Sequence, residues 1–249
     1  MQFENPIVEG QFIKRYKRFF ADVKINGDVC VAHVPNTGSL KSCLNEGALC
    51  RLTKSDDPKR KIKFTFEMIQ TPTSWVGVNT ARPNSLVFEQ CWLKKELPHW
   101  RDFSFAQREA KINPESRLDM VLWNQSVDDD NKFKFQWMKD KKFRGHFVEV
   151  KNVTYAIGAK ALFPDSVTER GQKHLRDLMK LMKKGHTAEI IFVIQRMDCN
   201  IFSPADAIDP EYGKLLRRAK KEGLIITPLS CELTKSGIQL ITSRLGVDL

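Results

Sequence analysis

The stretch that most limits the fold is residues 188–194, an almost unbroken apolar run of strand length. Such a run is typical of a strand covered on both faces, as in a mixed or parallel sheet. Before it, residues 165–184 carry leucines and methionines at helical spacing and are followed by Gly185, a common residue just past a helix end. Residues 147–152 alternate as a strand does. Strand, helix and strand in this order predict a right-handed βαβ crossover.

Other elements flank this crossover. A helix is expected over residues 84–97, ended by Pro98. A second helix opens at an Asp-Pro pair and covers residues 209–222, because proline suits the first turn of a helix. Short strands near residues 224–228 and 237–241 close the chain. The pattern predicts an α/β domain with a mixed sheet over residues 81–249.

Charged side chains interrupt two of the expected strands. In residues 147–152, alternation places Glu149 and Lys151 on one face, and in residues 117–122 it places Asp119 opposite the apolar positions. Acids and lysines also alternate on the solvated faces of many strands, so a Glu-x-Lys alone is a weak signal. Two acids and a lysine on adjacent strands are nevertheless what a metal-dependent phosphodiesterase needs.

A third acid is predicted from a hairpin register. If the hairpin that precedes Asp119 is centred on Pro114, Glu109 lies across from Asp119, since each is five residues from the centre. Glu109 is therefore a candidate metal ligand beside Asp119 and Glu149. The charged connection of residues 124–144 is expected to extend the hairpin arms and end in a mobile tip, with the three aspartates 128–130 in a solvated turn.

The first 80 residues consist of short alternating segments broken by turn residues, which indicates an all-β unit. Asn26-Gly27 between two such segments is a strong hairpin signal, because both residues tolerate positive φ. Five or six short strands in about 70 residues suit a small barrel of the OB type. We therefore predict an OB-like nucleic-acid-binding domain over residues 1–80.

Two basic clusters lie in this domain, one of them mixed with aromatic residues. Cations can follow a phosphate backbone while aromatic rings stack on bases, so the clusters predict a nucleic-acid face. The alternative is that alternation sends the aromatic side chains into the barrel and the cations to solvent. The Pro-Asn-Thr-Gly turn adds two polar candidates for phosphate contact. The candidate residues are Lys14, Arg15, Tyr16, Lys17, Arg18, Asn36, Thr37, Lys59, Arg60 and Lys61.

The overall charge also favours a polyanion as partner. The chain has 41 Lys and Arg against 30 Asp and Glu, a formal net charge of +11. Its six cysteines show neither a C-x-x-C pair nor zinc spacing, which indicates reduced thiols in a cytoplasmic protein. Neither an export signal nor an apolar run long enough for a membrane span is visible. The oligomeric state stays open.

Many segments in one order carry a resemblance that covers almost the whole chain. The chain resembles the bacterial sugar fermentation stimulation protein A family, and the order of its second half is similar to the PD-(D/E)xK nuclease core. The connection of residues 124–144 looks expanded relative to the family pattern. The segments that carry the resemblance are His33-Val34-Pro35-Asn36-Thr37-Gly38-Ser39, Ser116-Arg117-Leu118-Asp119, Val148-Glu149-Val150-Lys151-Asn152-Val153, and residues 3–6, 20–23, 54–61, 76–80, 163–175 and 202–206.

The resemblance implies an OB-like domain, a nuclease-like domain and DNA binding. In that reading Asp119 and Glu149 bind Mg²⁺ or Mn²⁺, and Lys151 orients water or neutralises the transition state. Gln172 on the following helix would position substrate or water, whereas His174 is expected to be a packed, hydrogen-bonded residue. The predicted function is phosphodiester hydrolysis. The alternatives are a non-catalytic DNA-binding regulator of sugar metabolism and an RNA-binding protein, and single-stranded and duplex DNA are both open as substrates.

Overall fold

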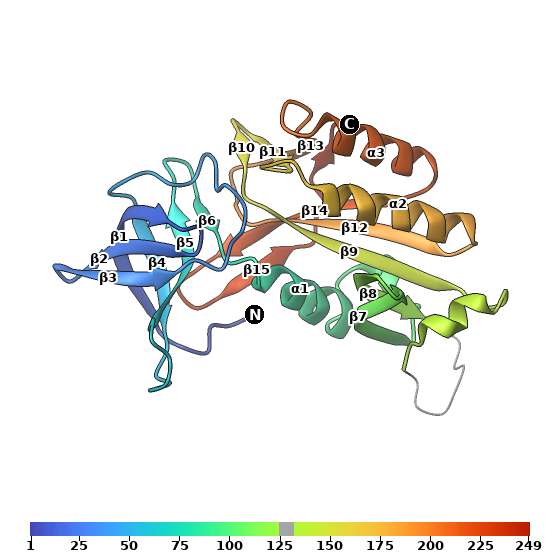
Figure 1. The fold of residues 1–249 in the computed structure, drawn as a ribbon, viewed down its shortest axis with the longest axis horizontal. Coiled ribbons are helices and arrows are strands. Elements are labelled where there is room, and N and C mark those ends of the chain that lie inside the picture. Colours follow the sequence, from blue (N-terminus) through green and yellow to red (C-terminus); the bar gives the residue numbers. More distant parts are fainter. Residues whose placement is uncertain (125–131) are drawn as a thin grey trace.

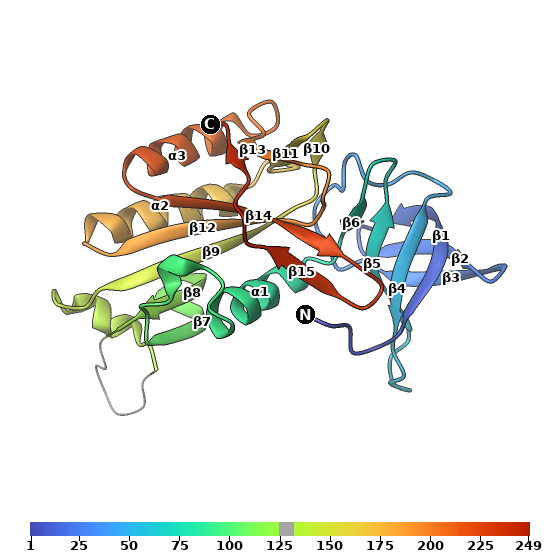
Figure 2. The ribbon, with the colours of Figure 1, turned by 180° about the vertical axis from the view of Figure 1, so that it is seen from behind.

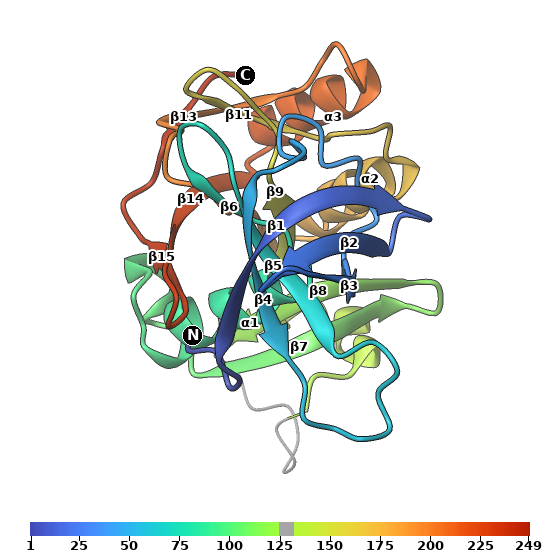
Figure 3. The same ribbon diagram turned by 90° about the vertical axis from the view of Figure 1, so that its left-hand side faces the viewer.

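The computed structural model describes residues 1–124 and 132–249. The first part is a closed barrel whose strands follow the order β3-β2-β1-β4-β5-β6, and β3 also pairs with β5 to close it (Figure 3). Asn26 and Gly27 have φ values of 51° and 98° between β2 and β3, which confirms the predicted hairpin. The barrel strands are β1 (Ile7–Tyr16), β2 (Phe20–Ile25), β3 (Asp28–His33), β4 (Leu49–Lys54), β5 (Phe64–Gln70) and β6 (Trp75–Gly77). The OB-like prediction is confirmed.

The second part is built on a mixed six-stranded sheet in the order β15-β14-β12-β9-β8-β7. Strand β12 pairs in parallel with both β9 and β14, which confirms the expected crossover. A small second sheet contains β10, β11, β13 and β16. The strands are β7 (Phe105–Asn113), β8 (Ser116–Trp123), β9 (Gly145–Val153), β10 (Ala156–Ile157), β11 (Lys160–Phe163), β12 (Thr187–Ile194), β13 (Ile201–Pro204), β14 (Ile225–Leu233), β15 (Ile238–Ile241) and β16 (Gly246–Val247).

Helices cover the sheet from both sides (Figures 1 and 2). On one face lie α2 (Glu169–Lys183) and α3 (Pro210–Lys221), which begin after the capping residues Thr168 and Asp209. They pack on alternate residues of β12, among them Phe192, in the larger hydrophobic core. On the other face lies α1 (Arg82–Leu86), which continues as a π-helical segment (Val87–Leu93). None of the described helices is long and apolar enough to cross a membrane.

Two details differ from the sequence predictions. The helix expected over residues 84–97 begins earlier and ends at Leu93, and Pro98 starts a short 3₁₀ helix (Pro98–Trp100) instead of ending a long one. Phe133 and Trp137 do not extend the arms of the hairpin; they are buried in the larger core, and Trp137 lies in a 3₁₀ helix (Phe135–Lys139). The aspartates 128–130 lie outside the described residues.

The two parts of the molecule are joined by buried polar contacts. Glu67 in β5 is fully buried and receives two hydrogen bonds from the guanidinium of Arg82 in α1, at 2.6 and 3.1 Å. The Gly77 N–H at the end of the barrel donates to the carbonyl of Gln195 just after β12. Residues 1–3 also lie against the second part, because Gln2 forms a β-bridge with Gly237. These contacts fix the barrel beside the end of the mixed sheet.

Candidate active site

Glu149 lies in the middle of β9, on the face covered by α2. Its side chain is only 3% exposed. The Lys151 ammonium donates to Glu149 Oε1 over 2.5 Å, and Nδ1 of His174 in α2 lies against the same oxygen. The second carboxylate oxygen, Oε2, is buried and has no hydrogen-bond partner among the described residues. Glu149 therefore keeps one oxygen unused in a site where an unpaired polar atom is costly.

Asp119 is held beside this group by the strand geometry. The ladder between β8 and β9 ends at the pair Met120–Val148, and Asp119 Oδ2 accepts the next main-chain N–H, that of Val150, over 2.7 Å. Asn84 in α1 donates to the other oxygen, also over 2.7 Å. The carboxylate is thus fixed at the point where β8 and β9 separate.

The two acids influence one another electrostatically. Burial and the charge of Glu149 raise the pKa of Asp119 to about 6, although the Val150 N–H opposes the shift. Burial also acts to raise the pKa of Glu149, but Lys151 and His174 outweigh it, so that pKa lies below its usual value. At neutral pH two negative carboxylates therefore share a poorly solvated site, an arrangement that a divalent cation stabilises.

The donor set fits a hard divalent cation. The residues available are the free Oε2 of Glu149 and the carboxylate of Asp119, which are oxygen ligands of the kind that Mg²⁺ prefers. Within residues 1–124 and 132–249 no group of three or more His, Cys, Asp or Glu is arranged to hold a metal ion. Two carboxylates, with main-chain and water oxygens completing the shell, match the hydrated coordination of Mg²⁺.

Glu109 does not join these two acids. The predicted register is present, because Arg108 pairs with Met120 and Ala110 pairs with Leu118 on either side of it. Glu109 itself has a φ of 53°, however, and its side chain is exposed. A left-handed residue interrupts the alternation of a strand, so cross-strand position no longer fixes side-chain direction. The prediction of Glu109 as a third metal ligand is wrong for this arrangement.

Gln172 connects two helices. Its Nε2 donates to both carboxylate oxygens of Asp209 at 3.0 and 3.2 Å. Asp209 caps α3 by accepting the Tyr212 N–H, and it also accepts the N–H of Thr168. Gln172 therefore holds the start of α2 against the start of α3, and its contact with substrate stays a prediction.

Two residues of the site were not among the sequence candidates. His174 was expected to be packed and hydrogen-bonded, and it is, but its partner is Glu149 itself. Its place on the buried side of a helix that must cover β9 was the available signal. Asn84, which holds Asp119, had no such signal, because 35 residues separate the two and only the tertiary fold brings them together.

In the basic cluster of residues 14–18, Arg15 has a structural role. Its guanidinium donates to the carbonyls of Arg18, Asn36 and Gly38 at 2.6 to 2.9 Å. Lys17 and Arg18 form the exposed turn between β1 and β2 and have positive φ values of 47° and 61°. Only part of this cluster therefore offers free cations.

The other basic and aromatic candidates are also either exposed or engaged in contacts within the barrel. Lys14 is exposed, with its ammonium 3.7 Å from the carboxylate of Asp22. Tyr16 stacks on Phe20 with ring centroids 5.9 Å apart. In the basic cluster of residues 59–61, Lys59 and Lys61 are exposed, whereas the side chain of Arg60 donates to Thr65 Oγ1 over 2.6 Å.

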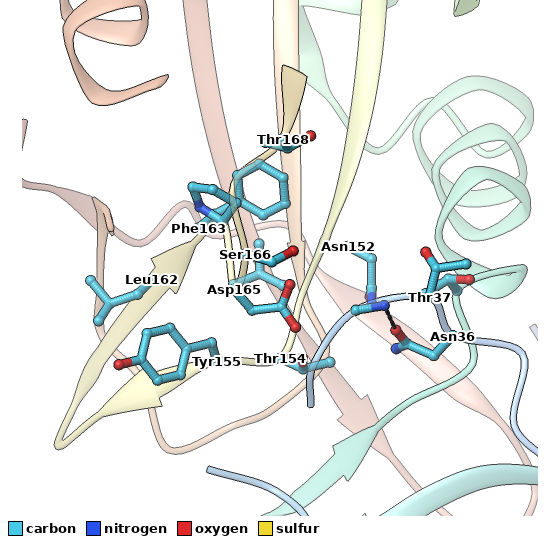
Figure 4. A pocket seen from close by; sticks show the side chains of 14 residues that line it. Asn36, Thr37, Asn152, Thr154, Tyr155, Leu162, Phe163, Asp165, Ser166 and Thr168 are labelled. Carbon is cyan, nitrogen blue, oxygen red and sulfur yellow. Dashed lines mark hydrogen bonds between the residues drawn. The ribbon is translucent and has the colours of Figure 1, made fainter. Parts of the chain in front are cut away.

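Asn36 and Thr37 differ in their exposure. Asn36 is 4% exposed, donates to the Val78 carbonyl and accepts the Gly38 N–H, so it shapes its own loop. Thr37 is exposed and lines a cleft between the barrel and the second part of the molecule (Figure 4). Both residues line the cleft, but the Asn36 amide is engaged within its own loop, whereas the Thr37 side chain is exposed.

A closed OB-like barrel fixed to a mixed-sheet domain, with two acids and a lysine on neighbouring strands, defines a two-domain class of protein. Residues 13–78 match the family model described as SfsA N-terminal OB domain, and residues 81–237 match the one described as Sugar fermentation stimulation protein RE domain. The chain belongs to the sugar fermentation stimulation protein family.

Relatives and a solved structure agree with this assignment. The chain is 51% identical to a sugar fermentation stimulation protein homolog of Bdellovibrio bacteriovorus, over 96% of each chain. It is 40% identical to the homolog of Geotalea uraniireducens, over 99% of each. The structure of Pyrococcus furiosus SfsA in complex with Ca²⁺ superimposes with a TM-score of 0.83 at 26% identity, covering 100% of this chain and 98% of that one. That relative therefore binds a divalent cation.

Proposed function

We propose that the protein hydrolyses phosphodiester bonds in DNA with a divalent metal, Mg²⁺ or Mn²⁺, held by Asp119 and Glu149. The observation that carries the proposal is the buried, unpartnered Oε2 of Glu149 beside Asp119, whose pKa is raised by the neighbouring charge. The Ca²⁺ bound by the Pyrococcus furiosus relative supports a divalent cation in this family. The formal net charge of +11 supports a polyanionic substrate.

Each residue of the site has a definite task in this proposal. Bound at the carboxylates, the metal supplies stabilisation of phosphate charge and a water of lowered pKa. Lys151 keeps Glu149 ionised through its 2.5 Å contact and places a positive charge where negative charge develops on the phosphate. His174 fixes Glu149 from the helix side, and Asn84 fixes Asp119.

A second candidate function is supported by the burial of the same site. The Glu149 side chain is 3% exposed and that of Lys151 is 14% exposed, so little of either is open to a substrate. A protein that binds DNA without cleaving it, as a regulator does, needs no access to these groups. The exposed Lys17, Lys59 and Lys61 suffice for contacts with phosphate in that case.

The experiment that separates these functions compares three labelled substrates. Single-stranded DNA, duplex DNA and RNA are incubated with the protein in Mg²⁺, Mn²⁺ or EDTA. We expect metal-dependent strand loss and a decrease of at least 100-fold in Glu149→Gln. Glu232→Gln, the same change at an exposed position of β14, serves as the matched control and keeps full activity. Cleavage that persists in Glu149→Gln overturns the site, and metal-independent binding without cleavage favours the regulator.

A further inference from the structure

A cleft runs between the barrel and the second part of the molecule and has two compartments. The inner compartment has a volume of about 230 Å³ and the outer one about 660 Å³. Thr37, Gly38 and Ser166 line both, so the compartments meet at these residues. The inner one includes Asn152, which follows Lys151 in β9 (Figure 4). The cleft therefore leads from the surface of the barrel to the strand that carries the candidate catalytic residues.

The inner compartment presents an oriented amide. Asn152 Oδ1 accepts a hydrogen bond from Gln195 Nε2 over 2.6 Å, and Gln195 is fully buried and also donates to the Asn79 carbonyl. With Oδ1 held in this way, the Asn152 Nδ2 has no acceptor in the part of the chain that the structure describes, so two N–H donors remain for a ligand. The rings of Tyr155 and Phe163 also line this compartment. Amide donors and aromatic rings together suit a nucleobase.

The outer compartment has the opposite character. Lys17 and Arg18 line it, and both are exposed. Asp165 lies on the inner side, where its carboxylate accepts hydrogen bonds from Ser39 Oγ and the Leu40 N–H, each at 3.1 Å. A phosphate is repelled by Asp165 and attracted by the two cations. Phosphates therefore favour the outer compartment and an uncharged base favours the inner one.

The size of the cleft limits what enters it. A volume of about 230 Å³ lies below the range of roughly 300–1,000 Å³ that takes a drug-sized ligand, so the compartment matches one base better than a base pair. A base within a duplex reaches such a pocket only after it is unstacked, which costs a few kcal/mol. The walls come from both parts of the molecule and are tied together at Asp165.

From this geometry we propose that the cleft binds a single-stranded nucleic acid, with one unpaired base in the inner compartment against Asn152 and the adjoining phosphates at Lys17 and Arg18. The inference rests on the proposed function and names its substrate class. Duplex DNA becomes a substrate only where its strands separate. Asn152, whose side chain leaves β9 on the opposite face from Lys151, then acts as a specificity residue, because its amide reads the edge of the base.

The test measures binding in EDTA, where no metal-dependent cleavage occurs. The probes are a labelled single-stranded oligothymidylate and a labelled blunt duplex hairpin, followed by fluorescence anisotropy. We expect the single strand to bind at least tenfold more tightly than the duplex. Asn152→Leu and Ser166→Trp, the second of which fills the junction of the two compartments from an exposed position, each weaken single-strand binding at least tenfold and leave duplex binding unchanged.

A matched control and the contrary outcomes complete the design. Asn200→Leu makes the same change at an exposed position away from the cleft and keeps wild-type affinity. Equal affinity for both probes, or single-strand binding that survives both cleft variants, overturns the proposal. Cleavage of single and double strands at equal rates leaves the nuclease proposal intact and removes only this one. Selective single-strand binding in the cleft without any cleavage supports the cleft proposal and overturns the nuclease proposal.

Discussion

The carboxylate of Asp119 accepts the main-chain N–H of Val150 over 2.7 Å, in the place where a strand carbonyl would otherwise pair. A side chain thus continues the ladder between β8 and β9 beyond its last backbone pair, Met120–Val148. The position of Asp119 therefore depends on the sheet itself, so the acid stays in place before any cation binds.

The ionised carboxylate of Asp119 is predicted to destabilise the metal-free protein. The folded-state pKa is about 6 against an ordinary 3.8, so the protonated form is favoured on folding, and the cost of ionisation is absent below pH 4 and complete above pH 6. Asp119→Asn should therefore raise the free energy of unfolding at pH 8 in EDTA by ~1–2 kcal/mol, after discounting for partial exposure. Asn84 can accommodate the change by turning its own amide.

Urea titrations of both proteins at pH 8 and pH 4 provide the measurement. The advantage of Asp119→Asn should be present at pH 8 and largely lost at pH 4, because wild-type Asp119 is then protonated. A wild-type protein that is the more stable one at pH 8 contradicts the charge repulsion inferred here.

Metal affinity should depend on pH through the same group. A coordinating carboxyl must lose its proton, so the apparent affinity for Mn²⁺ rises as pH increases through about 6 and levels off above 7. Calorimetry at pH 5.5 in two buffers of different ionisation enthalpy should show release of about one proton per bound ion. Affinity that is constant from pH 5 to pH 8 argues against Asp119 as a ligand.

Loss of the Lys151 ammonium should expose the cost of burying Glu149. Lys151→Met removes one of the two groups that hold Glu149 Oε1, and we expect a loss of about 2–4 kcal/mol in the free energy of unfolding. Adding Glu149→Gln to this variant should recover part of the loss, since the unpaired charge is then gone.

The stabilisation by Mn²⁺ provides an independent test of the contact between Lys151 and Glu149. Because a divalent cation replaces the missing positive charge, it should raise the Tm of Lys151→Met more than that of the wild type. Differential scanning fluorimetry of the two proteins with and without Mn²⁺ checks this, and an equal shift in both would place the ion elsewhere.

Arg15 and Lys17 should respond differently to substitution although they are two residues apart. Arg15→Lys keeps the charge but loses the fork that binds three carbonyls, so we expect a loss of roughly 1–3 kcal/mol in stability. Lys17→Gln should leave stability unchanged and lower the salt dependence of DNA binding by about one unit of slope. Chemical denaturation and anisotropy at several salt concentrations test the pair, and the reverse pattern would assign Arg15 to phosphate.

The features that the sequence predicted correctly are those determined by residues close together in the chain. The crossover of β9, α2 and β12 and the shared face of Glu149 and Lys151 follow from local periodicity and are confirmed. The role of Arg15 is not local, because two of the carbonyls it binds lie 21 and 23 residues further along the chain. For Glu109 the register was correct, but its left-handed backbone leaves no mark in the pattern of apolar residues.

The buried pairing of Glu67 with Arg82 has a consequence for how such a protein changes over generations. A barrel exchanged for a foreign one without this glutamate would leave the Arg82 guanidinium without its carboxylate partner. A foreign second half without the arginine would leave a fully buried carboxylate without its counter-charge, with only the hydrogen bonds from Thr53 and Asn79. Recombination at the boundary between the barrel and the second part is therefore destabilising. The two parts are expected to be inherited together and to change together in evolution.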